Sequence, residues 1–311
     1  MSSGVKTRGI LGLMVLMVTL FFLFLIFSFL IIGQLKMGKS DLAQGFAIGK
    51  EGQIGVVKVE GPIFESEKII KELLEAEKDS SLKAIIVRID SPGGVVGPTQ
   101  EIYEEIVRID ETKPVYASFG SVAASGGYYI GAAARKIYST PGVMTGSIGV
   151  IMQFMDLSEL YSWAKMKPET LKAGKYKDIG NPARGMTKEE RNLMGDLMND
   201  VHQQFIEDIE NRRKHLLRGD ITEMAQGQIF SGVQALELGL VDELAGLWEA
   251  GRRIYEELDL AKHGEFGLKF VRAKQKFSWL EFLQDMENKM SLIFESFAAR
   301  KETRVLYLME Q

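Results

Sequence analysis

The sequence predicts an α/β protein, a core of parallel strands and helices preceded by one transmembrane helix. From residue 53 onward, apolar strand patterns alternate with helical patterns, strand first, which is typical of parallel pairing. The segment from Ala84 to Asp90 is apolar enough for a strand buried on both faces. Upstream of this core, residues 10–32 form an unbroken apolar run.

The apolar run is long enough to span a membrane. As a helix at about 1.5 Å per residue it would measure about 35 Å, against a hydrocarbon core of about 30 Å. The run ends in mostly bulky residues, Ser28 to Ile32, whereas the apolar region of a cleaved signal peptide is followed by small residues at the cleavage site. We therefore expect a single-pass protein of the cell membrane. Residues 1–9 would lie in the cytosol, residues 10–32 would form the anchor and residues 33–52 a tether, with the body outside the cytoplasm.

The body is predicted element by element from apolar spacing and turn residues. The expected elements, in chain order, are a strand at 54–59, a helix at 65–76, a strand at 84–90, a helix at 99–110, a strand at 114–119, a helix at 129–134, short strands at 136–140 and 144–150, a loop region at 156–186, a long helix from Thr187, a helix between Ser231 and Gly239, a short apolar segment at 240–244 and a helix at 247–257. We expect the long helix to pack on the core through its apolar stripe. The domain should span residues 53–260, followed by a C-terminal amphipathic helix and tail at 261–311.

Composition excludes several functional classes. The 311 residues carry a formal net charge of −4, and their basic residues are scattered, so nucleic acid is not an expected partner. The absence of cysteine removes thiol nucleophiles, thiolate metal sites and disulfides. The three histidines are His202, His215 and His263, and His202 falls within an amphipathic helical pattern. Histidine catalysis and a metal site are therefore poorly supported, and no cofactor is expected.

A lone hydroxyl at a strand-to-helix turn is the first candidate for chemistry. Ser125 lies between small residues and the pair Gly126-Gly127, and a second pair, Gly93-Gly94, follows the strand that ends at Asp90. Two such pairs could direct two backbone N–H groups at one oxygen, as an oxyanion hole requires. Neither stretch has the spacing of a phosphate-binding loop. A close-packed turn without chemistry is the alternative.

A serine nucleophile needs a base, and a neutral lysine is the plausible one here. A lysine must lower its pKa from about 10.4 to about 7 or 8 for that role, which requires an apolar setting. Lys172, Lys175 and Lys177 cluster in one loop. The residues alone do not choose between these three lysines.

Four motifs in the same order resemble peptidase family S49: Asp90 to Gly94, Ala123 to Tyr129, Thr145 to Val150, and Gly174 to Asp178. The resemblance covers roughly residues 53–260. It implies a core related to those of crotonase and Clp protease, and a Ser/Lys dyad that cleaves remnant signal peptides in the membrane. It also implies a homo-oligomer, in which neighbouring chains complete a dome.

Roles carry over from the family position by position. The resemblance makes Ser125 the nucleophile, Lys177 the general base and Ser147 the serine that orients the lysine amine. Gly94 and Gly126 would supply the oxyanion N–H groups, with Gly93 as an alternate.

The resulting expectation is a membrane-anchored serine endopeptidase that cleaves apolar peptides. The alternatives are a crotonase-type acyl-CoA enzyme, which would hold a thioester enolate with the same N–H groups, and a non-catalytic membrane scaffold.

Overall fold

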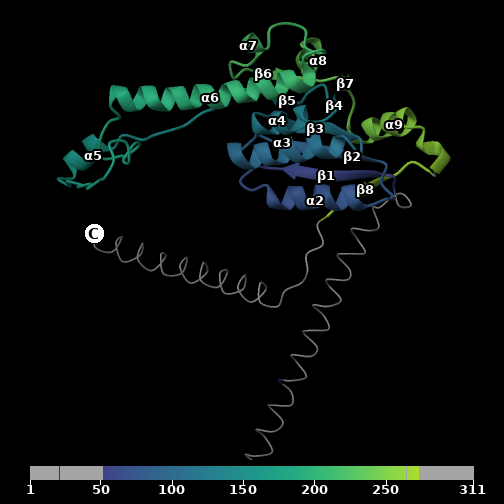
Figure 1. The fold of residues 1–311 in the computed structure, drawn as a ribbon, viewed down its shortest axis with the longest axis horizontal. Coiled ribbons are helices and arrows are strands. Elements are labelled where there is room, and N and C mark those ends of the chain that lie inside the picture. Colours follow the sequence, from purple (N-terminus) through teal and green to yellow (C-terminus); the bar gives the residue numbers. More distant parts are fainter. Residues whose placement is uncertain (1–20, 22–51, 264, 273–311) are drawn as a thin grey trace, which may run out of the picture.

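Strand and helix alternate along the chain from residue 54, as the sequence predicts (Figure 1). The computed structural model describes residue 21, residues 52–263 and residues 265–272. Apart from residue 21, the predicted membrane anchor at 10–32 lies outside the described residues, as do nearly all of the tether and the C-terminal chain beyond residue 272. No helix within the described part of the chain is both long and apolar enough to cross a membrane.

The elements of the body have these bounds: β1 (Ile54–Glu60), α2 (Glu67–Lys78), β2 (Ala84–Ser91), α3 (Val96–Asp110), β3 (Val115–Ala124), α4 (Gly126–Ala132), β4 (Lys136–Ser139), β5 (Met144–Gly146), α5 (Ser158–Trp163), α6 (Lys188–Arg213), α7 (Ile221–Met224), β6 (Ile229–Ser231), α8 (Gly232–Glu237), β7 (Glu243–Leu244), α9 (Leu247–Glu257), the 3₁₀ helix η1 (Leu260–His263) and β8 (Leu268–Phe270).

One sheet with a parallel core organises the body. Its strands follow the order β6-β5-β3-β2-β1-β8, and β4 pairs with β3 and β7. The β5–β6 pair is antiparallel, and the other pairs among the described strands are parallel. This confirms the predicted α/β class. Because β8 pairs with β1, the sheet reaches further along the chain than the expected domain of residues 53–260.

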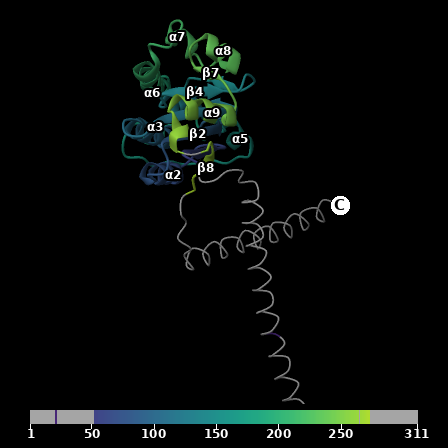
Figure 2. The same cartoon turned by 90° about the vertical axis from the view of Figure 1, so that its right-hand side faces the viewer.

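Both faces of the central strands are covered, which explains their continuous apolar sequence. Val57, Val87 and Ala117 are in register across β1, β2 and β3 and belong to the cluster that includes α2, α3 and α4. Their neighbours Ile86 and Tyr116 belong to the opposite cluster, which includes α9. Figure 2 shows α2 and α3 together on one side of the sheet.

Two expectations for the second half of the body are wrong. The strand expected at 144–150 ends at Gly146, because Gly146 and Ser147 have φ values of 78° and 50°, outside the extended region. The long helix packs on the body only through its C-terminal half, where Phe205 and Ile209 are buried. Leu193 and Leu197, near its beginning, are 44% and 48% exposed.

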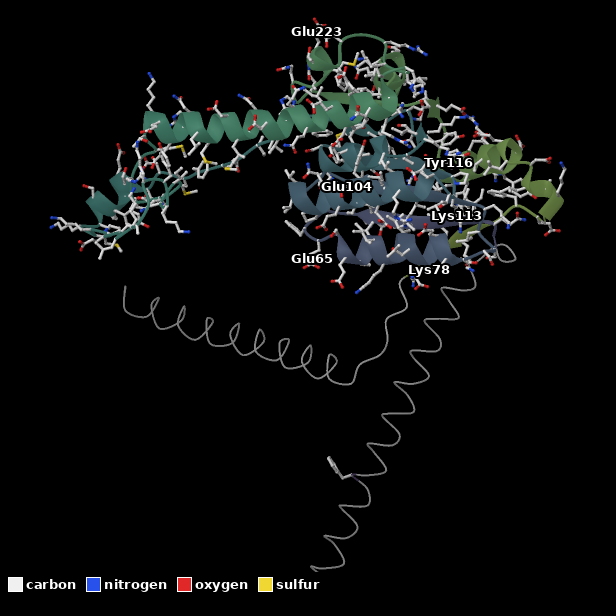
Figure 3. All side chains as sticks on the ribbon, viewed as in Figure 1. Glu65, Lys78, Glu104, Lys113, Tyr116 and Glu223 are labelled. Atoms are coloured by element: carbon white, nitrogen blue, oxygen red, sulfur yellow. The ribbon has the colours of Figure 1, made fainter. Side chains whose placement is uncertain are left out.

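An arm extends from the body as a result. We define the arm as residues 152–200, which include α5 and the first half of α6. The 26 residues of α6 measure about 39 Å at about 1.5 Å per residue, so the helix reaches past the sheet, with α5 near its far end (Figure 1). Several sulfur atoms lie close to the first half of α6 (Figure 3). The arm is therefore an extension that the single chain leaves largely uncovered, with apolar side chains exposed among its charged ones.

A buried ion pair fixes the other end of α6. The Arg213 side chain is 1% exposed, and its Nη2 donates to Asp242 Oδ1 at 3.0 Å. The second carboxylate oxygen of Asp242 accepts the Ile137 N–H at 2.6 Å, at the start of β4. The pair therefore ties the end of α6 to the sheet.

Replacing Asp242 by asparagine should strongly destabilise the protein, because Arg213 would keep its buried charge without a counter-charge. We expect Asp242→Asn to lower the free energy of unfolding by about 3–5 kcal/mol, measured by urea denaturation. Arg253→Gln is the matched control, since Arg253 pairs with Glu243 at a half-exposed site and should change stability by about 1 kcal/mol or less. Equal effects of the two substitutions would contradict this account.

Candidate active site

Ser125 occupies a strained turn between β3 and α4. Its φ of 52° and ψ of −121° lie outside the regions that residues with a side chain normally adopt, at a cost of about 1–3 kcal/mol. The Ser125 N–H donates to the Gly146 carbonyl at 2.8 Å, and the Tyr129 N–H donates to the Ser125 carbonyl at 2.9 Å. These bonds hold the strained turn in place. The Ser125 hydroxyl has no hydrogen-bond partner within the described residues.

A cavity of about 520 Å³ opens beside Ser125. Its walls come from the start of α3, the first turn of α4, the segment 147–151 after β5, and the middle of α6. None of the described residues that line it is Asp, Glu, Lys or Arg. A charged group entering this cavity would lose its water without gaining a counter-charge from these walls.

Ser147 lines the same cavity, as the resemblance implied. Ala124 and Gly146 are register partners on the parallel strands β3 and β5, so Ser125 and Ser147 follow at neighbouring positions. Ser147 also has a positive φ, and its N–H donates to the Gln228 carbonyl at 2.6 Å. Two strained serines therefore stand side by side at the ends of adjacent strands.

Gly94 and Gly126 provide the two free N–H groups. Both line the cavity, and neither N–H has an acceptor among the described residues. A Cβ placed on Gly126 would lie 3.2 Å from the Gly94 nitrogen, so the backbones of Gly94 and Gly126 are close to each other. Gly93 does not fit the role, because its N–H donates to the Ser91 hydroxyl at 3.1 Å. The alternate oxyanion donor expected from the sequence is therefore wrong.

The side chain of Asp90 stabilises the turn region that carries these groups. The register between β2 and β3 shifts between Ile89 and Ser91, which interrupts the regular ladder. At this irregularity the Asp90 carboxylate accepts the Val122 N–H at 3.1 Å. Asp90 is the first residue of the first motif. Its side chain therefore supplies the acceptor that a regular ladder would have given the N–H of Val122, three residues before Ser125.

Lys177 does not lie in the Ser125 cavity of its own chain. It is exposed in a turn of the arm, between α5 and α6, and is absent from the cavity walls. Its amine has no partner within the described residues, whereas Lys172 pairs with Asp178 and Lys175 pairs with Glu189. The hydrogen bond to Glu189 raises the pKa of Lys175, which disfavours a neutral amine there. Of the three lysines, Lys177 is the one whose amine is not held by a carboxylate.

A network of ion pairs shapes the loop around Lys177. Arg184 donates to Asp178 at 2.9 Å and to Glu190 at 2.6 Å. Glu190 also closes a capping box with Thr187 at the start of α6. The hydrogen bond from Arg184 is the main reason that the pKa of Glu190 falls to about 2. This network connects the turn beside Lys177 to the first turn of α6.

Comparison with known proteins supports the resemblance. The model for "Peptidase family S49" matches residues 108–261, and the model for "Clp protease" matches residues 55–145. A candidate protease from Synechocystis sp. is 38% identical over 200 residues, covering 64% of this chain and 72% of that protein. The chain belongs to peptidase family S49. It is a serine endopeptidase.

Two further relatives of this S49 peptidase are named for the same activity. A candidate signal peptide peptidase of Enterococcus faecium is 31% identical over 182 residues, covering 58% of this chain and 53% of that protein. The chloroplastic serine protease SPPA of Arabidopsis thaliana is 34% identical over 197 residues, covering 63% of this chain and 29% of that protein. The S49 chain thus spans about half or less of these two relatives.

The structure adds a residue that the sequence argument set aside. His202 lines the cavity of Ser125, together with Met198, Val201 and Phe205 from the same face of α6. Its Nε2 is buried without a hydrogen-bond partner in the described residues, so it does not bond to Ser125. The helical spacing was visible in the sequence, but the partner of that helical face was not.

Gly94→Ala should abolish the peptidase activity, because a Cβ there would lie 2.0 Å from the Ile63 carbonyl oxygen and displace the loop. We expect a loss of at least about 100-fold in kcat, as for removal of one oxyanion donor. Gly97→Ala is the control three residues away, since nothing lies within 4 Å of its Cβ. That variant should keep full activity, and comparable losses in both would refute the assignment of the Gly94 N–H.

Acid should loosen the loop around Lys177. The pKa of Glu190 is lowered from 4.5 to about 2, so its pairing stabilises the loop fully above pH 4.5 and is lost as the pH falls towards 2. Hydrogen-exchange protection factors for residues 178–190 should fall in that window. In Arg184→Gln they should be low throughout. Protection that is independent of pH in the unsubstituted protein would contradict this link.

Proposed function

We propose that this chain cleaves apolar peptides with a Ser125/Lys177 dyad. The observation that carries the proposal is the Ser125 hydroxyl, held in a strained turn beside the free N–H groups of Gly94 and Gly126 in one cavity. A packing turn gains nothing from such strain, whereas strain of this kind is concentrated at functional sites.

In the proposed reaction, the neutral amine of Lys177 takes the proton of the Ser125 hydroxyl. The Ser125 oxygen attacks the carbonyl carbon of the substrate, and the N–H groups of Gly94 and Gly126 stabilise the negative oxygen that forms. The protonated amine then gives its proton to the leaving amine, and water releases the acyl group by the same route. Ser147, adjacent to Ser125, would orient the lysine amine.

The dyad would be completed by a neighbouring copy of the chain. Lys177 stands on the arm and does not line the cavity of its own chain. The arm and its base expose large apolar side chains: Ile151, Met155, Trp163 and Leu171 are 85%, 69%, 82% and 92% exposed. Exposed large apolar side chains in such number are typical of protein interfaces. A homo-oligomer would bury it and carry Lys177 to the next cavity, whose uncharged walls favour a neutral amine.

The substrate class follows from the walls and the backbone of the cavity. Its uncharged lining disfavours charged side chains next to the cut. The segment Gly149 to Ile151 lines it, and no backbone hydrogen bond joins these residues to another described residue. An extended peptide could pair with such a free edge. Remnant signal peptides are apolar chains of this kind. An anchor at residues 10–32 would hold the enzyme in the cell membrane with its body outside the cytoplasm.

The alternatives receive less support. A crotonase-type acyl-CoA enzyme would depend on acidic residues near the oxyanion hole, and none lies among the described residues of the cavity wall. A non-catalytic scaffold would have no use for a strained, unpartnered hydroxyl. Labelling with a serine-reactive phosphonate separates the three functions: the peptidase should be modified at Ser125 and Ser125→Ala should not. An unlabelled Ser125 in a folded, full-length protein would exclude the proposal.

Mixing two inactive variants tests whether the dyad spans two chains. Ser125→Ala and Lys177→Ala should each be inactive, as should Lys177→Arg, because guanidinium stays protonated. Co-expressed in equal amounts, the two alanine variants should regain about a quarter of wild-type activity, since random neighbours pair an intact serine with an intact lysine in about one site of four. A double variant, Ser125→Ala with Lys177→Ala, co-expressed with wild type serves as the control for assembly. Failure of the mixture to regain activity would refute a shared dyad.

A further inference from the structure

The loop between β1 and α2 packs directly against the turn that carries Gly94. Ile63, in this loop, forms an isolated parallel bridge with Gly94. The Ile63 N–H donates to the Gly93 carbonyl at 3.0 Å, and the Val95 N–H donates to the Ile63 carbonyl at 2.8 Å. The backbone of Ile63 is therefore bonded both to the residue before Gly94 and to the residue after it.

The first of these bonds fixes the direction of the Gly94 N–H. The Gly93 carbonyl and the Gly94 N–H belong to one peptide group, and in a trans peptide the two point in opposite directions. Because the carbonyl points to Ile63, the N–H points away from Ile63. Gly126 lies close to that N–H, since a Cβ placed on Gly126 would be 3.2 Å from the Gly94 nitrogen. The Gly94 N–H is therefore directed to the side of the second oxyanion donor, in the cavity that both glycines line.

The loop that carries Ile63 is itself held in place. The Gly61 N–H donates to the Asp90 carbonyl at 3.0 Å, near the end of β2. The side chain of Ile63 is 3% exposed and belongs to the same core cluster as the central strands. The fit against Gly94 is close, because a Cβ there would lie 2.0 Å from the Ile63 carbonyl oxygen. The loop is thus a packed support behind the Gly94 N–H.

The bond from Ile63 also makes the Gly94 N–H a stronger donor. A peptide group whose carbonyl accepts a hydrogen bond is more polarised, so its N–H donates more strongly. A negative oxygen bound at that N–H would in turn strengthen the bond from Ile63. A donor that is fixed and polarised in advance stabilises the transition state without having to reorganise during the reaction.

We propose that Ile63 is a positioning residue of the active site, whose backbone N–H directs the Gly94 N–H at the oxyanion. Ile63 is not among the residues that line the cavity, so it acts through Gly94 and does not touch the substrate. This inference rests on the proposed cleavage at Ser125. It requires the bond to matter in the transition state and little for binding of the uncleaved peptide. A merely structural loop would change the amount of folded protein and leave the kcat of the folded part unaltered.

Replacing Ile63 by its α-hydroxy acid analogue in the full-length protein removes the N–H and keeps the side chain. We expect kcat to fall about tenfold with KM within about twofold of wild type, because the oxyanion donor is displaced but not deleted. A peptide aldehyde, whose adduct with Ser125 carries the same negative oxygen, should bind more weakly by the same factor. The matched control is the ester at Glu65, because neither its N–H nor the Phe64 carbonyl has a backbone partner among the described residues.

Two variants at Gly61 test the loop by ordinary mutagenesis. Gly61 has a φ of 74°, and nothing lies within 4 Å of a Cβ built on it, so a side chain there meets no neighbour. Gly61→Val imposes this left-handed conformation on a β-branched residue, whereas Gly61→Asn adds a side chain of similar size that tolerates it. Measured on folded protein, kcat should fall several-fold in Gly61→Val and stay close to wild type in Gly61→Asn.

A kcat for the Ile63 ester within about twofold of wild type would overturn this role, and so would an equal loss in the Glu65 ester. A rise in KM without a fall in kcat would also contradict it, since the bond would then serve substrate binding. If the Ile63 ester does not fold, the Gly61 pair decides, and equal kcat values in the two variants would exclude the role. If the wild type neither cleaves peptides at Ser125 nor binds the aldehyde, the proposed function fails and this role fails with it.

Discussion

The parallel pairing of β2, β3 and β5 is the constraint on which the site depends. Parallel neighbours end at the same edge of a sheet, so the segments that follow them meet there even though they are far apart in the chain. Ser91 is in register with Ala123, and Ala124 with Gly146. The turn after β2 then supplies the Gly94 N–H, the turn after β3 supplies the Ser125 hydroxyl, and Ser147 follows β5. The buried central strands therefore align these chemical groups.

The local strain at the site is maintained by this same framework. Ser125 and Ser147 both adopt positive φ values, which residues with a Cβ rarely do. Backbone hydrogen bonds to Gly146 and from Tyr129 surround Ser125, and the Asp90 carboxylate supports the neighbouring strand end. The strain is tolerable because the surrounding bonds determine the backbone path. Its consequence is a hydroxyl presented to the cavity with no competing partner in the described chain.

The helix α6 connects this rigid site to the arm. At one end the Arg213–Asp242 pair ties it to the sheet. Towards the same end, Asp208 accepts a hydrogen bond from the hydroxyl of Tyr129, one turn of α4 beyond Ser125. At its beginning the helix has left the body, and its capping box is joined to the loop of Lys177. One continuous helix thus links the Ser125 turn, the cavity wall and the candidate base. A neighbour that packs on the arm would therefore contact the same helix that forms one wall of the candidate site.

The sequence by itself determined the α/β class and most element positions, and it predicted Ser125 as the candidate nucleophile. Apolar periodicity and glycine pairs are local signals, and Ser125, Gly94, Gly126 and Ser147 all follow strands that such signals locate. The tertiary structure decided what depends on distant partners. It removed Gly93 as a donor, through a bond to Ser91, and it brought His202 into the cavity. It also left Lys177 outside the cavity, because periodicity shows that a helix has an apolar face but not whether its own chain or another covers that face.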